Sequence, residues 1–261
     1  MAGSLGLVVP AYRPDVDALE HYIAELRETL SPATIRIELD NSPRDIEAAL
    51  GSIGDDVVLG TAPERRGKGA AITHGFEQLS TDVLAFADAD GSTPAASVSE
   101  VIEPVRLGDA ALSVGSRRHP DATVRSHQTL IRRRLGDAFA YVAGKLLDVA
   151  LTDYQCGVKA VSRTAWEDVR YHLYERGFAW DVELIAITAA RGHRVVEIPI
   201  VWEDQPGSTV SPIRTTLGMG RGLLAARHRA RLMKGDPLHG AVDAWRDDRT
   251  PLVPRPDSID E

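Results

Sequence analysis

Short apolar runs of strand length alternate along this chain with longer stretches that carry a helical stripe of apolar residues. The first run, Leu5–Pro10, precedes a stripe that starts behind a predicted N-cap at Asp15 and consists of Leu19, Ile23, Leu26 and Leu30. The alternation continues, with strands predicted at 34–39, 57–59, 83–87 and 110–114 and helices at 45–53, 69–79 and 98–107. This order predicts an α/β fold with a Rossmann-like, mostly parallel twisted sheet and helices on both of its faces.

The second half of the sequence is less regular. It predicts a long apolar helix over 131–150, a helix over 181–191, a strand over 195–201 and a basic helix over 212–234. No internal repeat interrupts this order, so we predict one domain over 1–235. The remaining residues, 236–261, combine four prolines with many acidic residues, which predicts a weakly ordered tail.

Composition narrows the class of protein. The single cysteine, Cys156, excludes an intramolecular disulfide framework and a cysteine-only zinc site. The N-terminal residues lack the basic region and cleavage site of a signal peptide, and no window approaches the roughly 18 apolar residues of a membrane span. We therefore expect a cytoplasmic protein that is either soluble or peripheral to the inner face of the cell membrane.

The formal net charge of -8 is unevenly distributed. Residues 115–134 carry +5 and residues 214–234 carry +6, which leaves -19 on the rest of the chain. A basic face on an acidic body favours phosphates or an anionic membrane surface, and it disfavours nucleic acid because no helix-turn-helix signal is present. The leucines and six basic residues of 212–234 suit a helix lying in a membrane interface. A helix packed on the core with a solvated basic face is the alternative.

Two carboxylates, Asp88 and Asp90, follow the all-apolar strand predicted at 83–87, and Gly91 lets the backbone turn sharply after them. Ligands of parallel sheets bind at the carboxyl ends of the strands. Mg²⁺ or Mn²⁺ held by one or two carboxylates and by substrate phosphate oxygens fits this pair. An acidic turn that caps a helix is the alternative, although the position after a buried strand favours the metal.

Two further segments are candidates for a nucleotide site. Glu64–Gly69 places glycines and Lys68 before a predicted helix, where backbone amides and the helix N-terminus favour an anion, but the spacing is not that of a Walker loop. Asp40 follows the second predicted strand and can accept a hydrogen bond from a nucleobase N–H. An exposed turn and a helix cap are the respective alternatives.

Taken in order, these segments resemble the family 2 glycosyltransferases of the GT-A fold. The resemblance covers roughly residues 5–215 and is nearest to the polyprenyl (dolichyl) phosphate hexose synthases, in particular the dolichyl-phosphate glucosyltransferase and archaeal N-glycosylation branch. It rests on Val8-Val9-Pro10-Ala11-Tyr12, Asp40, Gly67-Lys68-Gly69-Ala70-Ala71, Asp88-Ala89-Asp90-Gly91, Gly115-Ser116-Arg117, Asp153-Tyr154-Gln155-Cys156-Gly157-Val158-Lys159 and Phe178-Ala179-Trp180-Asp181-Val182-Glu183-Leu184.

The resemblance implies a metal-dependent, inverting transfer of glucose or mannose from a UDP- or GDP-hexose to polyprenyl (dolichyl) phosphate, for protein glycosylation or cell-surface glycan assembly. It also implies roles for single residues. Pro10, Ala11 and Tyr12 would line the nucleotide pocket, with Asp40 on the base and Lys68 near the nucleotide. Asp88 would lie near the ribose and the metal, and Asp90 would ligate the metal. Arg117 and Arg132 would receive the lipid phosphate.

The sequence departs from its relatives at two places. Asn41 stands where the family has a second carboxylate after the second strand, and Gly136 stands where a serine often follows the second arginine. Arg133 or Arg134 could share the phosphate with Arg132.

The acceptor chemistry explains why these groups suffice. A phosphate monoester is largely a dianion at neutral pH, so a strong general base is unnecessary. Positioning and charge neutralisation remain for the protein to supply. Asp181 is our candidate to orient the sugar or acceptor, Gln155 is a candidate sugar contact, and Glu183 has a structural helix-end role as its alternative.

Three other functions stay open from the sequence alone. These are a glycosyltransferase with a soluble or glycan acceptor, a sugar-phosphate nucleotidyltransferase, and a non-catalytic sugar-nucleotide binder. The Pro10–Pro14 segment after the first strand disfavours the nucleotidyltransferase, whose loop at that place is G-x-G-x-R. The presence of Asp90 and Arg117 disfavours the non-catalytic binder.

Overall fold

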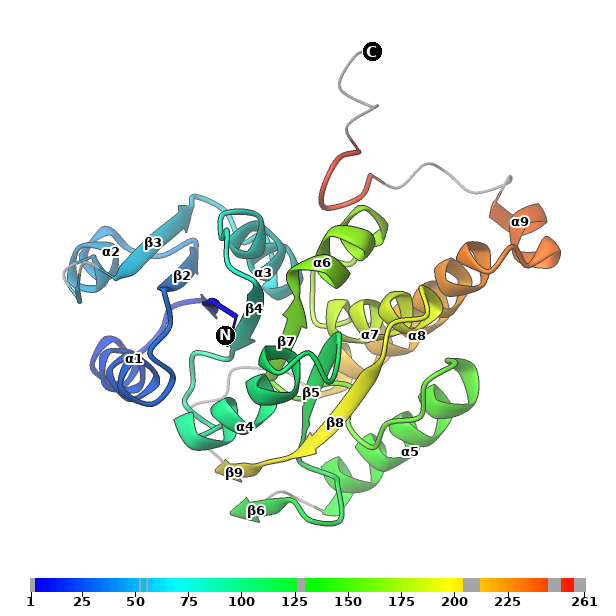
Figure 1. The fold of residues 1–261 in the computed structure, drawn as a ribbon, viewed down its shortest axis with the longest axis horizontal. Helices are drawn as coiled ribbons and strands as arrows, with labels where there is room; N and C mark the ends of the chain where they lie inside the picture. The colour runs from blue at the N-terminus through cyan, green and yellow to red at the C-terminus, as the bar shows by residue number, and fades with distance from the viewer. Residues whose placement is uncertain are drawn as a thin grey trace.

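The chain folds around a seven-stranded mixed sheet with the strand order β3-β2-β1-β4-β7-β5-β8 (Figure 1). This computed structural model describes residues 3–51, 53–54, 56–125, 130–203, 212–243 and 250–255, without the side chains of 130–134, 212–217 and 242–243. The sequence-predicted α/β architecture, mostly parallel with helices on both faces, is confirmed.

The predicted strands and helices are found within a few residues of their expected bounds. The strands are β1 (Leu5–Ala11), β2 (Thr34–Asp40), β3 (Val57–Ala62), β4 (Val83–Ala87), β5 (Leu112–Ser116), β6 (Thr123–Arg125), β7 (Val158–Ser162), β8 (Val195–Pro199) and β9 (Val201–Glu203). The helices are α1 (Val16–Leu30), α2 (Arg44–Leu50), α3 (Lys68–Glu77), α4 (Ala95–Arg106), α5 (Leu130–Leu146), α6 (Arg163–Val169), α7 (Trp180–Ala190), α8 (Pro212–Met233) and α9 (Pro237–Asp243), with a 3₁₀ turn at Arg170–His172.

The sequence predicted neither the short strand β6 nor β7, and the direction of β7 shapes the functional edge of the sheet. β7 lies between β4 and β5 and runs antiparallel to both. The carboxyl ends of β1, β2, β4 and β5 lie at one edge of the sheet, so the entry to β7, rather than its exit, reaches that edge. Residues 153–157 therefore lie beside the ends of β4 and β5.

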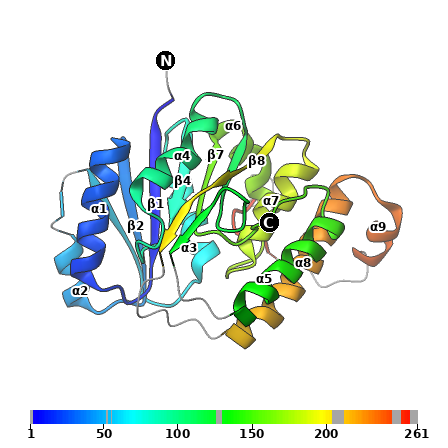
Figure 2. The same ribbon diagram turned by 90° about the horizontal axis from the view of Figure 1, so that it is seen from below.

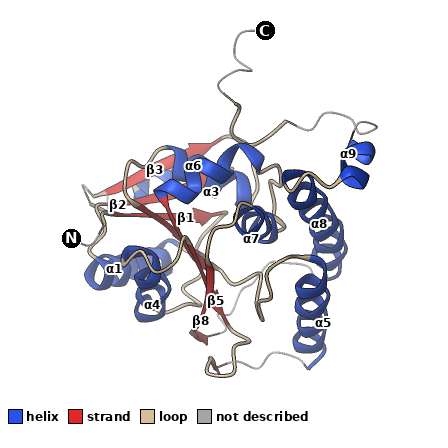
Figure 3. Ribbon diagram, turned by 45° about the vertical axis from the view of Figure 1, so that its right-hand side comes forward, coloured by secondary structure: helices blue, strands red, loops and turns tan. Residues whose placement is uncertain are grey.

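Two apolar layers cover the sheet, one on each face (Figures 2 and 3). Alternate β1 residues divide between them: Leu7 faces the layer of α1 and α4, whereas Val8 faces the layer of α3, α6 and α7. α1 begins as predicted, with the Asp15 carboxylate accepting a hydrogen bond from the Ala18 amide at 3.1 Å. Every member of its apolar stripe is buried.

The C-terminal part of the chain differs from the sequence prediction. α8 packs on α7, and Leu223 and Ala226 of this helix are buried while Leu224 is exposed. Most of its described apolar side chains thus contact the core, which corrects the expectation of an apolar face turned toward a membrane and favours the core-packing alternative. Among the ranges that the structure covers, no helix has the length and apolar composition needed to cross a bilayer.

The segment after residue 235 also packs more than predicted. Residues 237–243 form α9, and Val253 is buried. The Leu252 amide donates to the Leu173 carbonyl at 2.8 Å. Leu252 and Val253 are therefore held against the domain, and 237–243 are helical although largely exposed, in contrast to the weak order predicted for 236–261.

Candidate active site

Four side chains of alternating charge form a chain at the carboxyl edge of the sheet, in which Asp88 is partly exposed and Lys68, Asp181 and Lys159 lie deeper. The Lys68 ammonium lies 2.8 Å from Asp88 Oδ1 and 3.4 Å from Asp181 Oδ2. The Lys159 ammonium lies 2.6 Å from Asp181 Oδ1 and donates to the Cys156 carbonyl at 2.9 Å. Both oxygens of Asp181 thus contact a lysine. The structure places Asp181 below the surface of the site, where it fixes two cations.

The start of α3 presents Lys68 to this chain of charges. Burial by itself would lower the pKa of Lys68, but the carboxylates of Asp181 and Asp88 outweigh it and raise that pKa. Both lysines also lie over the ring of Phe86, with Nζ 5.0 and 5.5 Å from its centroid. The Lys68 ammonium is therefore a fixed positive charge at the N-terminus of α3.

Asp88 and Asp90 differ in their surroundings although they are one residue apart. Burial raises the pKa of Asp88, Lys68 opposes this and Asp90 adds to it. Asp90 is exposed, and its Oδ1 accepts a hydrogen bond from the Ser92 amide at 2.9 Å across a turn in which Gly91 has a φ of 67°. Asp88 contacts the β7 entry, because its amide donates to the Gly157 carbonyl at 2.8 Å.

Gly157 is required by this contact. A Cβ atom at that position would overlap Asp88 Oδ2 and would lie 2.6 Å from Cγ. Only a glycine lets the loop before β7 approach the carboxylate so closely. Gln155, the predicted sugar contact in the same loop, is partly exposed, and its backbone N–H donates to Asp153 Oδ1 at 3.0 Å.

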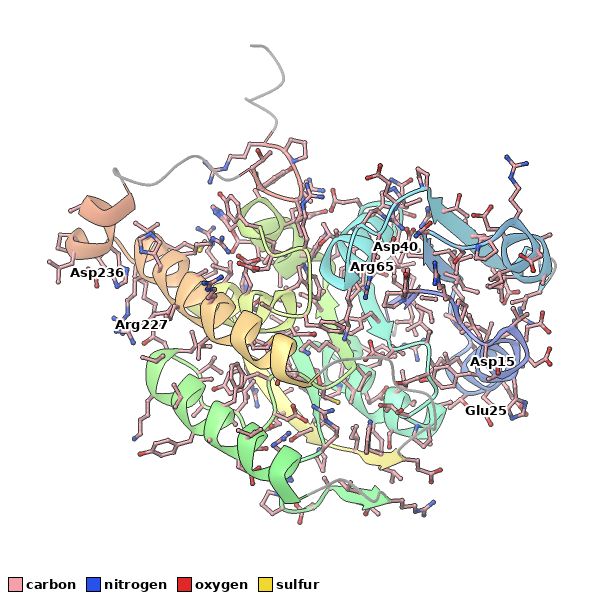
Figure 4. The ribbon with its side chains drawn as sticks, turned by 180° about the vertical axis from the view of Figure 1, so that it is seen from behind. Asp15, Glu25, Asp40, Arg65, Arg227 and Asp236 are labelled. Atoms are coloured by element: carbon pink, nitrogen blue, oxygen red, sulfur yellow. The ribbon has the colours of Figure 1, made fainter. Side chains whose placement is uncertain are left out.

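The predicted nucleotide side of the site lies at the ends of β1 and β2. Asp40 is buried, and its carboxylate accepts from Arg66 Nε at 2.7 Å and from the Gly67 amide at 2.9 Å. Tyr12 is exposed by 36%, and the guanidinium carbon of Arg65 lies 4.3 Å from its ring centroid. Figure 4 shows Asp40 and Arg65 close together beside α3.

Pro10 and Ala11 end β1 beside these groups, and neither is exposed. Asn41, the departure from the family pattern, has a φ of 46°, a left-handed conformation that asparagine tolerates better than most residues. A carboxylate has about four lone-pair positions, so Asp40 keeps acceptor capacity beside its two partners.

Arg117 follows β5 and is bound to Asp153 through two of its three guanidinium nitrogens. Nε lies 2.7 Å from Oδ2 and Nη2 lies 3.0 Å from Oδ1 of the carboxylate. Burial alone would raise the pKa of Asp153, but Arg117 lowers it to about 2. The fork orients the arginine at the edge, 5.8 Å from the ring centroid of Trp202. Arg132, Arg133 and Arg134 belong to α5, but their side chains lie outside the described residues.

Glu183 has the structural role that was its alternative in the sequence. It is fully buried, and its Oε2 accepts from the backbone amides of Tyr174 and Glu175 at 2.8 Å each. Its Oε1 pairs with Arg229 of α8. Burial raises its pKa to about 7 although the arginine and the two amides oppose this. Glu183 thereby joins α7, α8 and the loop that reaches the start of α3, where the Ala70 amide donates to the Arg176 carbonyl at 3.1 Å.

Three residues of this edge were missed by the sequence reasoning as members of the site. Lys159 and Asp153 stand in the quoted motif, but their ion pairs join positions 22 and 36 residues apart, which a single sequence does not reveal. A signal was present for Lys159, because a lysine inside an apolar run of strand length predicts a buried charge with a partner. Arg118, whose Nη1 lies 3.8 Å from Asp153, had no such signal. Cys156 is buried, and burial raises its pKa to about 12.

Within the part of the chain that the structure describes, a metal would find a carboxylate pair rather than a complete ligand cage. In the described ranges, no three His, Cys, Asp or Glu side chains cluster so that they could hold an ion. Oxygen donors from Asp88 and the exposed Asp90 fit a hard cation that takes its other ligands from a substrate.

Comparison with known proteins identifies the family of this chain. Residues 7–169 match the family model described as glycosyl transferase family 2. The chain is a family 2 glycosyltransferase. It is 30% identical over 230 residues to the glycosyltransferase AglD of Haloferax volcanii, which covers 84% of the chain but 36% of that protein. It is 28% identical to the human dolichyl-phosphate beta-glucosyltransferase over 94% of the chain and 78% of the human protein.

The solved structures of other glycosyltransferases agree on the fold. Glucosyl-3-phosphoglycerate synthase from Mycobacterium tuberculosis, crystallised with Mn²⁺, UDP and phosphoglyceric acid, has a TM-score of 0.63 at 17% identity, over 87% of this chain and 78% of that one. Mannosyl-3-phosphoglycerate synthase from Rubrobacter xylanophilus has a TM-score of 0.66 at 16% identity, over 90% of this chain and 76% of that one. These likenesses show the GT-A-type α/β fold of this glycosyltransferase.

Proposed function

We propose that this glycosyltransferase moves a hexose, glucose or mannose, from a nucleoside diphosphate sugar to polyprenyl (dolichyl) phosphate, with inversion and with a divalent metal. The relatives named as dolichyl-phosphate glucosyltransferases support the acceptor, since one of them matches 94% of the chain. The chain spans 36% and 52% of the lengths of the first two curated relatives, so their whole activities are proposals for it.

The state of the carboxylates at the site carries this proposal. Asp153 contacts Arg117, which lowers its pKa to about 2, and Asp181 contacts two lysines, whereas Asp88 and Asp90 are the pair that we assign to the metal. A carboxylate held by an adjacent cation is a poor general base, because the positive charge favours its ionised form. A hydroxyl acceptor needs a base to remove its proton, whereas a phosphate dianion attacks without one. The arrangement therefore suits an acceptor that brings its own negative charge.

On the donor side, Asp88 and Asp90 would hold Mg²⁺ or Mn²⁺. Such an ion supplies neutralisation of the charge that develops on the departing nucleoside diphosphate. Lys68, fixed between Asp88 and Asp181, adds a positive charge beside that leaving group. Asp181 then acts by orienting Lys68 and Lys159, while Gln155 approaches the sugar from the loop before β7.

The nucleotide would bind at the ends of β1 and β2. Tyr12 offers an exposed ring for a base to stack on, with Pro10 and Ala11 forming the floor. Asp40, oriented by Arg66 and by the Gly67 amide, would accept a hydrogen bond from the base.

On the acceptor side, Arg117 and Arg132 would receive the phosphate. Asp153 engages Nε and Nη2 of Arg117, and Nη1 is the guanidinium nitrogen that we assign to a phosphate oxygen. Guanidinium geometry should therefore matter as well as charge. A lipid acceptor also places the protein at a membrane surface, peripheral to the inner face of the cell membrane.

The decisive assay incubates the purified protein with radiolabelled UDP-glucose, UDP-galactose or GDP-mannose, Mg²⁺ or Mn²⁺, and one of three acceptors. The acceptors are undecaprenyl phosphate, undecaprenol and 3-phosphoglycerate, and the Asp90→Ala variant is the control. We expect label in the lipid extract with undecaprenyl phosphate alone. Transfer to 3-phosphoglycerate or to the alcohol, with none to the lipid phosphate, would replace this proposal with a hydroxyl-acceptor transferase.

A further inference from the structure

A pocket of about 450 Å³ lies between α5 and residues 150–152, beside the acceptor side of the site. Its volume is within the range of ligand sites in proteins. Most of the wall is apolar or small, and two cations and one carboxylate stand among the lining residues, which are Arg118, Asp137, Ala140, Tyr141, Gly144, Lys145, Ala150, Leu151 and Thr152.

The pocket adjoins the end of β5 through direct contacts. Thr152 Oγ1, in its wall, lies 2.9 Å from Oγ of Ser116, the residue before Arg117. Arg118 lines the pocket, and its Nη1 lies 3.8 Å from Asp153 Oδ2, the same oxygen that Arg117 Nε contacts at 2.7 Å. The guanidinium groups of Arg117 and Arg118 are thus neighbours, one at the site and one in the pocket.

Arg118 reaches this place because of the glycine that departs from the family pattern. A Cβ atom at Gly136 would overlap the Arg118 guanidinium. Arg118 Nε also donates to the Asp137 carboxylate at 3.1 Å, so the acidic group of the pocket is already paired. The excess charge of the lining is positive, supplied by Lys145.

The open side of the pocket continues onto exposed apolar residues of α5. Tyr141 is exposed by 69% although it lines the pocket, and Val142 beside it by 45%. Water-facing apolar side chains of this size at the rim of an apolar pocket are typical of a surface that binds a hydrophobic ligand. Figures 2 and 3 show α5 on the outside of the molecule, alongside α8.

We propose that this pocket binds the isoprene units next to the phosphate of the acceptor, with Arg118 on the phosphate side. This inference rests on the proposed function. A polyprenyl phosphate consists of a dianionic phosphate and a branched hydrocarbon chain. In the structure, a cationic edge that can hold the phosphate adjoins an apolar pocket that can hold the first part of the chain. Burial of hydrocarbon supplies affinity, and Arg118, which lies beside the Arg117–Asp153 pair, fixes which end of the lipid points to Arg117.

The test uses calorimetry to measure how tightly farnesyl monophosphate, below its micellar concentration, binds to the protein in the absence of nucleotide sugar. Gly144→Leu and Ala150→Leu fill the pocket. At Gly144 the nearest atoms to a new Cβ are Tyr154 Oη at 3.6 Å and Ala150 at 3.9 Å, so the backbone accepts a side chain there. Ala138→Leu on the exposed surface of α5, outside the lining, is the matched control.

We expect both filling variants to weaken farnesyl monophosphate binding about tenfold or more, the control to stay within about twofold, and UDP binding with Mn²⁺ to remain unchanged in all three. Dodecyl phosphate, an unbranched chain of the same main-chain length, should bind the wild type less tightly, because it buries less apolar area. Equal binding of farnesyl monophosphate by the filled and wild-type proteins would overturn the inference. Equal wild-type binding of dodecyl phosphate would overturn the polyprenyl assignment.

The transfer assay separates this inference from the proposed function. If the filling variants transfer hexose to undecaprenyl phosphate as well as the wild type does, the proposed function stands and the pocket inference is overturned. Farnesyl monophosphate binding that is lost on filling, in a protein that transfers no hexose to any polyprenyl phosphate, would support the pocket and overturn the function.

Discussion

Replacing Lys159 and Asp181 singly and together measures how much these two buried charges stabilise each other. Lys159 is 1% exposed, and its ammonium has the Asp181 carboxylate at 2.6 Å and the Cys156 carbonyl at 2.9 Å. Lys159→Met keeps much of the volume but removes the nearer cation from Asp181, which retains Lys68 at 3.4 Å. Breaking a buried pair costs about 3–5 kcal/mol, and the remaining lysine places the loss near the lower end.

Asp181→Asn should cost a similar amount, because it leaves the buried Lys159 ammonium without a counter-charge while Lys68 keeps Asp88 at 2.8 Å. Once Lys159 is already methionine, however, that penalty is absent. We therefore expect each single variant to lose about 3 kcal/mol and the double variant about 4 kcal/mol, a coupling of about 2 kcal/mol. Such losses are a large fraction of the 5–15 kcal/mol that stabilises a typical domain.

The assay is urea unfolding of the four proteins at pH 7, followed by circular dichroism, with the exposed Lys145→Met as a matched control. The control should stay within about 0.5 kcal/mol of the wild type. Single losses below about 1 kcal/mol would refute the reasoning, and so would a double variant whose loss equals the sum of the singles, since the two groups would then stabilise the fold independently.

Asp90→Ala should lower transfer at least about a hundredfold but cost no more than about 1 kcal/mol of stability, because the exposed side chain loses one hydrogen bond, from the Ser92 amide; near-normal turnover would remove it from the site. Asp40→Ala should raise the donor KM more than it lowers kcat, and an unchanged KM would contradict base binding. Arg117 lowers the pKa of Asp153 from 3.8 to about 2, so this group stabilises the fold by about 2 kcal/mol above pH 4 and loses that contribution as the pH falls through 2; Asp153→Asn should show a smaller loss of unfolding free energy between pH 5 and 2. Burial raises the pKa of Cys156 from 9.0 to about 12, so native protein at pH 8 should react with a thiol reagent only after guanidinium is added, and rapid native labelling would be inconsistent with that burial.

The sequence was most informative where periodicity and strand ends coincide. Apolar patterns located β1 to β5 and their helices, and the rule that ligands bind at the carboxyl ends of strands placed Asp40 and Asp88 at one edge, where the structure has them. β7 escaped prediction because Lys159 interrupts its short apolar run and because the alternation rule anticipates a parallel strand. Its direction, and the ion pairs that it makes possible, depend on contacts between distant segments.

The helix α8 shows a feature that the sequence alone could not decide. Its basic, leucine-containing sequence fits an interfacial helix and a core helix equally well. In the folded protein, packing on α7 buries Leu223 and Ala226, so α8 is a core helix. Amphipathic composition identifies a helix with two kinds of face, but the partner of the apolar face is a tertiary property.

The antiparallel strand β7 also sets an order of events during synthesis. The strands β3, β2, β1 and β4 are complete and mutually adjacent once residue 87 has left the ribosome, whereas β5 has only β7 and β8 as neighbours. About 40 residues separate the end of β5 from the start of β7, which at 5–20 residues per second is a wait of roughly 2–8 s. Throughout this interval β4 and β5 have unpaired edges that can pair with another nascent chain. A ribosome pause within residues 117–157 should therefore increase aggregation more than a pause after residue 162.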